Sequence, residues 1–345
     1  HVEAGDFVIS MRSFQGGLEY STKSGAISSA YVMLVPNLEL VYPRFYRWLL
    51  KSSVYIDALQ RTTNMVRDGQ AMRYSNFAQV RLFTLPLDEQ KSRADFLDLE
   101  CSSIDKILFK TRSSIEEYKK LKQTVITQAV TKGVRGEREM KDSGVEWIGE
   151  IPKEFNPVQL KFFCKLITDG THFSPTTVEN GWPYITAGDV HGIGLDYNSA
   201  KRISEEDFQL LVAQGCQPLK GDVLLVKDGA TTGRVGFVDS DTPCVILSSV
   251  AMLRPADNAD GHYLMYLLAS DFLQKQILVS MAGSAMPRTT LTKLTKYIGL
   301  LPPLHEQKEI ANYLDAKCAE IDKLIAKKEQ LVNCLLYTSP SPRDG

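Results

Sequence analysis

The 345-residue sequence lacks the usual marks of a membrane or disulfide-stabilised protein. No apolar run approaches the about 18 residues that a membrane helix needs, and the six cysteines are scattered without a CxxC pair. The formal net charge is only −1, so overall charge neither indicates nor excludes a polyanionic partner. We therefore expect a reduced, cytoplasmic protein with no membrane partner.

Motifs of catalysis are also missing. The glycine-rich run from Gly229 to Gly236 has no GK[ST] and lies between two strand-like runs, so it predicts a hairpin loop rather than a phosphate-binding loop. HExxH, GxSxG and (N/D)PP(Y/F) do not occur, and no two histidines have metal-ligand spacing. His172 fits either a ligand or base contact or an ordinary loop histidine. We expect no catalysis, metal or cofactor in this chain.

What the sequence does contain is a long repeat. Residues 86–115 recur without a gap at 303–332, and 13 positions hold the same residue type, Gln90 and Gln307 among them. This agreement indicates a tandem duplication of a mixed domain followed by a helix.

Each copy predicts a long helix. The first begins after Pro86, has Asp88 and Glu89 in its positive first turn and ends before Gly133, which gives a rod of roughly 65 Å. Its apolar stripe needs a partner, and the other copy offers a matching one. We therefore expect an antiparallel coiled coil rather than two independent surface helices. The residues predicted to pair are Leu97, Ile104, Ile107, Leu121, Leu314, Ile321 and Leu324.

Around the helices, the sequence predicts an α+β fold with two mixed domains. Runs rich in β-branched residues at 223–227, 234–238 and 250–253 are typical of strands. An amphipathic helix is expected over 261–281, and Pro43 can open its counterpart in the first copy.

Comparison of the copies predicts that both ends are truncated. No counterpart of residues 151–216 precedes His1, and the second helix gives way to a segment with two prolines. The predicted segments are 1–85 (C-terminal part of the first domain), 86–132 (first helix), 133–152 (linker), 153–301 (second domain), 302–335 (second helix, cut short) and 336–345 (a foreign or disordered tail).

Basic residues gather beside both helices. Residues 272–305 hold four basic residues and no acidic one, and residues 58–87 hold four arginines against Asp68 alone. With neighbouring hydroxyls, such side chains fit phosphate positioning and groove readout, and the alternative is an ordinary solvated surface. The candidate DNA contacts are Lys227, Thr231, Thr232, Arg234, Arg288, Thr289, Thr290 and Lys293 in the second domain and Arg67, Arg73 and Tyr74 in the first.

Three segments carry a resemblance to a known family. The two Pro-Leu-x-Glu-Gln-Lys openings, the run 129–133 that closes the first helix and the linker phrase from Met140 to Pro152 resemble the specificity subunit of type I restriction-modification systems. The resemblance covers residues 1–332.

The resemblance implies two target-recognition domains, each reading one half of a bipartite sequence in double-stranded DNA. It also implies two conserved helices that set the spacing and dock two modification (methyltransferase) subunits. S-adenosylmethionine chemistry would belong to those subunits, and ATP- and magnesium-dependent translocation and cleavage to restriction subunits. Two alternatives stay open: the specificity portion of a fused restriction-modification enzyme, and a coiled-coil scaffold whose mixed domains bind protein.

Overall fold

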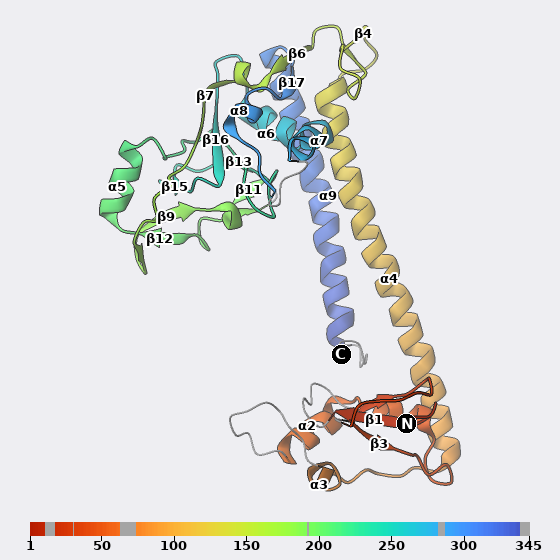
Figure 1. Cartoon of the computed structure of the whole chain (residues 1–345). Helices are drawn as coiled ribbons and strands as arrows, with labels where there is room; N and C mark the ends of the chain where they lie inside the picture. Colours follow the sequence, from red (N-terminus) through yellow and green to blue (C-terminus); the bar gives the residue numbers. More distant parts are fainter. Residues whose placement is uncertain (11–17, 30, 63–73, 192, 282–286, 339–345) are drawn as a thin grey trace. The chain divides into compact units, whose positions relative to one another are not determined.

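The computed structural model describes residues 1–10, 18–29, 31–62, 74–191, 193–281 and 287–338. It divides into two compact units, residues 1–116 with 325–345 and residues 117–324. Two long helices, α4 (Leu87–Lys132) and α9 (Leu304–Thr338), contribute a part to each unit. Both units mix α and β structure, as the sequence predicts (Figure 1).

Proline and glycine residues mark the ends of the long helices. Helix α4 starts after Pro86 and closes on Gly133, whose positive φ of 74° is the left-handed conformation common after a helix. Helix α9 runs three residues past the predicted end at 335. Because a proline restricts mainly the residue before it, Pro340 permits helix through Thr338.

Among its described residues, the first unit has one antiparallel sheet and three short helices beside α4. The strands β1 (Phe7–Ser10), β2 (Leu18–Tyr20) and β3 (Tyr31–Leu34) pair in the order β2-β1-β3. The helices are α1 (Pro43–Leu49), α2 (Ser53–Thr62) and α3 (Tyr74–Phe77). Ile9 of β1, Leu59 of α2 and Ala94 of α4 are fully buried in one core, so the sheet, the helices and α4 fold as a single body.

The second unit is built on a four-stranded antiparallel sheet. Its strands, in the order β14-β13-β16-β7, are Val235–Phe237, Val223–Val226, Val250–Pro255 and Cys164–Asp169. Central strand β13 is apolar at every position, and its alternating side chains place Val223 and Leu225 in one core and Leu224 and Val226 in another. The predicted strands at 223–227, 234–238 and 250–253 are confirmed.

A second, mixed sheet and three two-stranded ribbons complete the strands of this unit in the described part of the chain. The mixed sheet, in the order β15-β9-β12-β8, consists of Val245–Ile246, Trp182–Ile185, Lys201–Ile203 and Thr177–Val178. The ribbons pair β17 with β6 (Ile298–Leu301, Asn156–Gln159), β10 with β11 (Val190–His191, Gly194–Leu195) and β4 with β5 (Met140–Asp142, Glu150–Pro152).

The helix expected over 261–281 is two helices. Helix α6 (Gly261–Ala269) and helix α7 (Asp271–Ser280) are separated by Ser270, whose ψ of 149° is extended. The buried Ser270 hydroxyl donates to the Leu267 carbonyl (2.6 Å), which stabilises the break. The remaining helical segments are η1 (Leu160–Phe162), η2 (Ala187–Asp189), α5 (Glu205–Ala213) and α8 (Leu291–Leu294).

The linker predicted at 133–152 packs on the second unit. Ile151 is fully buried in its main core. Arg138 pairs with Glu306 of α9 (2.6 Å), which is only 1% exposed, and lies over the Phe155 ring. A buried carboxylate requires such a partner, so the linker is fixed to the start of α9.

In both units α4 packs on α9. In the first, Leu108, Ile115 and Val332 form a buried cluster. In the second, Lys122 pairs with Asp322 (2.6 Å) and Arg135 with Glu309 (2.8 Å). Residue numbers rise along α4 as they fall along α9, so the antiparallel pairing predicted from the repeat is confirmed.

Three of the seven predicted pairing residues are wrong. Leu314 and Ile321 are buried and Leu97 and Ile104 partly buried, but Ile107, Leu121 and Leu324 are 46%, 47% and 37% exposed. The reason is that small and polar residues occupy buried positions on α4, namely Cys101 (7%) and Thr111 (8%). With these included, positions 101, 108, 111 and 115 of α4 are buried and position 104 is partly buried, which is the alternating three- and four-residue spacing of a coiled coil.

The repeat reappears in the structure as one hydrogen-bond pattern made twice. Gln90 is fully buried, donates to the carbonyls of Leu40 (2.9 Å) and Leu85 (2.7 Å) and accepts from the Tyr42 N–H (2.7 Å). Gln307, also fully buried, donates to the carbonyls of Asn258 and Pro302 (both 2.9 Å) and accepts from the Asp260 N–H (2.8 Å). We call each set of three bonds a glutamine clasp; it fixes the start of the long helix to the segment that leads into α1 or α6.

An aspartate two turns further along each long helix makes a second duplicated contact. Asp98 accepts from Trp48 Nε1 (2.8 Å) and Arg44 Nε (3.0 Å), and Asp315 accepts from the Tyr266 hydroxyl (2.8 Å) and lies 3.3 Å from His262 Nδ1. Arg44 and His262 are the second residues of α1 and α6. Burial disfavours ionisation of Asp98, but its hydrogen bonds from Arg44 and Trp48 outweigh this and hold its pKa below the ordinary value. In each copy, the glutamine and the aspartate together anchor a short helix to the long one: α1 to α4 and α6 to α9.

Candidate nucleic-acid interface

The second unit brings the eight predicted DNA contacts of its domain into one region. The hairpin loop between β13 and β14 lies against the segment before α8, because the Gly229 N–H donates to the Pro287 carbonyl (3.0 Å) and the Thr289 N–H to the Lys227 carbonyl (2.9 Å). Gly229 and Gly233 have φ of 98° and 99°, which favour glycine. The hairpin predicted for this glycine-rich run is confirmed.

Four of these residues have exposed side chains. Arg288 is 60% exposed and pairs through Nε with Asp228 (2.8 Å), and Arg234 is exposed on the hairpin. Thr290 caps α8 by accepting from the Lys293 N–H (3.3 Å), and Lys293 Nζ donates to the Ser280 carbonyl (2.5 Å). These four groups can reach a polyanion with little rearrangement.

Thr231 and Thr232 are half-buried in the same loop. The Thr232 hydroxyl donates to the Gly229 carbonyl (2.7 Å), so it stabilises the turn.

Two of the eight residues are buried, and their predicted DNA contact is corrected. Lys227 has a side-chain exposure of 4% and binds Asp228 (2.7 Å) and Asp169 (3.3 Å). Thr289 is fully buried, with its hydroxyl 2.6 Å from that of Tyr297. Residue type predicted both, but each side chain is directed inward to a partner from another part of the sequence, Asp169 for Lys227 and Tyr297 for Thr289.

The first unit offers less. Arg67 and Arg73 lie outside the described residues. Tyr74 opens α3, is 56% exposed and has its ring 6.0 Å from that of Phe77, so its position leaves it accessible.

Sequence reasoning missed two residues of this region, Asp169 and Asp228. Asp169 ends β7 and is followed by Gly170, where a Cβ would come within 1.9 Å of the Ile246 carbonyl oxygen; only glycine fits there. The sequence signal for Asp169 is the run Asp169-Gly170-Thr171-His172, in which an aspartate stands directly before the glycine. His172 is itself exposed, with Nε2 3.9 Å from Asp169.

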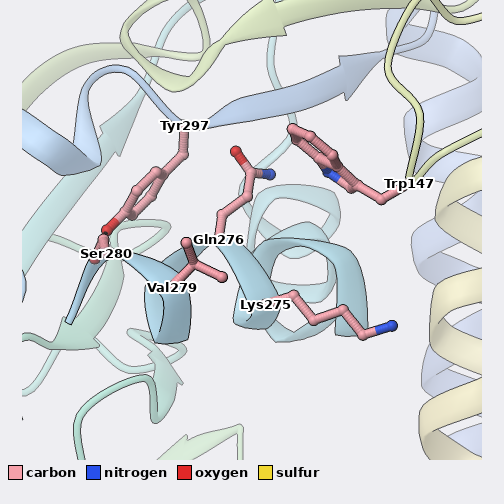
Figure 2. Close-up of a pocket in the computed structure, with 6 residues that line it drawn as sticks. All are labelled: Trp147, Lys275, Gln276, Val279, Ser280 and Tyr297. Atoms are coloured by element: carbon pink, nitrogen blue, oxygen red, sulfur yellow. The ribbon is translucent and has the colours of Figure 1, made fainter. Parts of the chain in front are cut away.

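A separate cavity of about 490 Å³ opens on α7. Figure 2 shows the rings of Trp147 and Tyr297 on opposite sides, with Gln276 between them. Gln276 is already bonded to both backbone groups of Ile298 (2.9 Å each), and the Tyr297 hydroxyl donates to Ser280 (2.5 Å). The Gln276 amide and the Tyr297 hydroxyl are therefore already paired within the chain.

Within the described part of the chain, no three His, Cys, Asp or Glu side chains gather as a metal site would require. No helix found there is long and apolar enough to cross a bilayer.

Comparison with known proteins identifies the family. Residues 152–333, more than half of the chain, match the type I restriction modification DNA specificity domain. The chain is 25% identical to the type I restriction enzyme MjaVIII specificity subunit of Methanocaldococcus jannaschii, over 97% of this chain and 79% of that protein. It is 24% identical to the EcoBI specificity subunit of Escherichia coli, over 82% of this chain and 62% of that protein.

Two solved structures share the fold. A chain from a study of complex assembly and conformational transition of the type I R-M system superposes with a TM-score of 0.77 at 18% identity, covering 98% of this chain and 80% of that one. The HsdS subunit from Thermoanaerobacter tengcongensis gives a TM-score of 0.54 at 19% identity, covering 98% and 81%. The chain belongs to the type I restriction modification DNA specificity family and is a non-catalytic specificity subunit.

Proposed function

We propose that this subunit reads a bipartite DNA target, with one half recognised by each mixed domain and α4 and α9 setting the distance between the halves. The observation that carries the proposal is the duplicated anchoring. Gln90 and Asp98 on α4 and Gln307 and Asp315 on α9 occupy equivalent positions and bind equivalent helices. A domain tied to its helix at two points keeps one orientation, which reading at a fixed spacing requires.

The exposed side chains of the second domain supply the chemistry for one half-site. Phosphate contacts by Lys293 and Arg234 would give salt-dependent affinity for any sequence, whereas an arginine that binds a guanine edge contributes about 1–3 kcal/mol of discrimination. Arg288 is the candidate for this role because its guanidinium is exposed and held at one edge.

Electrophoretic titration of the chain with its modification subunits tests the DNA assignment. Arg288→Ala is expected to weaken binding to the selected target and to reduce preference in one half-site only. If Arg288→Ala leaves both affinity and half-site preference unchanged, that assignment is wrong.

We further propose that two modification subunits dock on the long helices. Phe96 and Ile107 of α4 are 63% and 46% exposed, and their repeat equivalents on α9, Tyr313 and Leu324, are 40% and 37% exposed. Residues 11 apart lie three turns along one helix face, so each helix carries the same exposed apolar pair. Two equivalent surfaces suit two copies of one partner.

Native mass spectrometry of the assembled complex tests the docking. Ile107→Asp and Leu324→Asp are each expected to remove one modification subunit, and the double variant both. Phe109→Asp is the matched control, because Phe109 is 75% exposed and lies about 200° around α4 from Ile107. Retention of two subunits by the double variant would contradict the proposal.

A further inference from the structure

Four charged side chains of alternating sign form a row of ion pairs that links three loops of the second unit. Asp169, after β7, lies 3.3 Å from Lys227 Nζ, which is 2.7 Å from Asp228; Asp228 in turn binds Arg288 Nε at 2.8 Å. From Lys227 outward along this row, side-chain exposure increases from 4% at Lys227 through 26% at Asp228 to 60% at Arg288. A buried lysine is thus linked through a partly exposed aspartate to an exposed guanidinium.

The Lys227 ammonium group forms ion pairs with the two carboxylates and is shielded from solvent. A buried ammonium group is stable only when paired, and here it is paired twice. Without Lys227, two like charges would stand close together and repel each other. Lys227 therefore fixes Asp169 and Asp228 in place.

Asp228 in turn restrains Arg288. Its Oδ1 contacts Nε, at the inner edge of the guanidinium, and the backbone of the two residues is joined as an isolated β-bridge. A free arginine samples many rotamers, and a restrained one loses less freedom when it binds. Because two acids and two bases cancel, Asp169, Lys227, Asp228 and Arg288 together add no net attraction for phosphates.

We propose that Asp228, fixed by buried Lys227 and Asp169, is a positioning residue that orients Arg288 to read a base in the half-site of the second domain. The statement rests on the proposed DNA recognition. Loss of the Asp228 charge should lower selectivity between sequences while affinity for unrelated DNA stays equal or rises, because one negative charge is removed. A folding defect would instead lower affinity for all DNA.

Selection of bound sequences from random duplex DNA, followed by salt titration, tests the proposal with the full chain assembled with its modification subunits. For Asp228→Asn we expect preference at one base pair to fall about tenfold while binding to unrelated DNA does not weaken. Arg288→Lys, at an exposed position, keeps the charge but not the planar fork, so the same base pair should lose its preference with an unchanged salt slope.

Asp241→Asn is the matched control, since Asp241 is 82% exposed, pairs with the exposed Lys220 (3.2 Å) and undergoes the same change of charge. It should leave every base preference unchanged. Full preference in Asp228→Asn, or in Arg288→Lys, would overturn the inference and leave DNA reading intact. Equal loss of selected and unrelated DNA by Asp228→Asn would also overturn it. An unmodified chain without any base preference would instead refute the proposed function.

Discussion

Replacing Gln307 by methionine tests the clasp that holds the second domain to α9. Methionine has a similar length and no hydrogen-bonding amide, so little cavity forms and the main effect is the loss of three hydrogen bonds of 2.8 to 2.9 Å. Each unpaired buried group costs about 1–3 kcal/mol. Since Asn258 is exposed and water can reach its carbonyl, we expect a total near 3–4 kcal/mol.

The loss should appear locally. Hydrogen exchange measured by mass spectrometry should speed up roughly a hundredfold or more in peptides of α6, because about 1.4 kcal/mol corresponds to a factor of ten. Gln90→Met should do the same in peptides of α1, whose clasp has bonds of 2.7 to 2.9 Å. Neither change should affect the other domain's helix.

Gln330→Met is the control, because Gln330 is on α9 with an exposed side chain and surface changes usually alter stability by less than about 0.5 kcal/mol. The reasoning is refuted if Gln307→Met exchanges at the rate of Gln330→Met throughout α6.

Two other features give sharp expectations. Arg138→Met removes the ion-pair partner of Glu306, which is only 1% exposed, so the free energy of unfolding measured in urea should fall by about 3–5 kcal/mol. Adding Glu306→Gln should recover much of this loss. Equal stability of Arg138→Met and the unmodified chain would contradict the expectation. Burial raises the pKa of Cys164 and of Cys244 to about 12, so a maleimide at pH 7.5 should modify exposed Cys334 first and these two only after denaturation; their rapid labelling in the native protein would show that the cores are not closed.

Much of the fold could be predicted from the sequence because proline, glycine and apolar runs mark the element boundaries clearly. Pro86 and Gly133 bound α4, and the apolar run of β13 identifies a central strand. The phase of the helix pairing differs from the prediction because Thr111 and Cys101, a polar residue and a small one, occupy buried positions on α4 that a stripe of large apolar residues does not mark.

The candidate interface was predicted less well. Arg288 is exposed, as its predicted DNA contact requires, but Lys227, predicted from its charge, is buried between two aspartates. Which way a lysine points depends on pairing between strands that are distant in sequence. The roles of Gln90 and Gln307 were equally hidden: the repeat marked them as equivalent, and only the structure shows what they bind.

The central claim is that one chain reads two separated half-sites. Its most direct test is selection from random duplex DNA by the chain assembled with its modification subunits, with sequencing of the enriched pool. We expect two short specified blocks divided by a fixed number of unspecified base pairs, with changes at Arg288 altering one block only. A single contiguous block, or no enrichment, would contradict it.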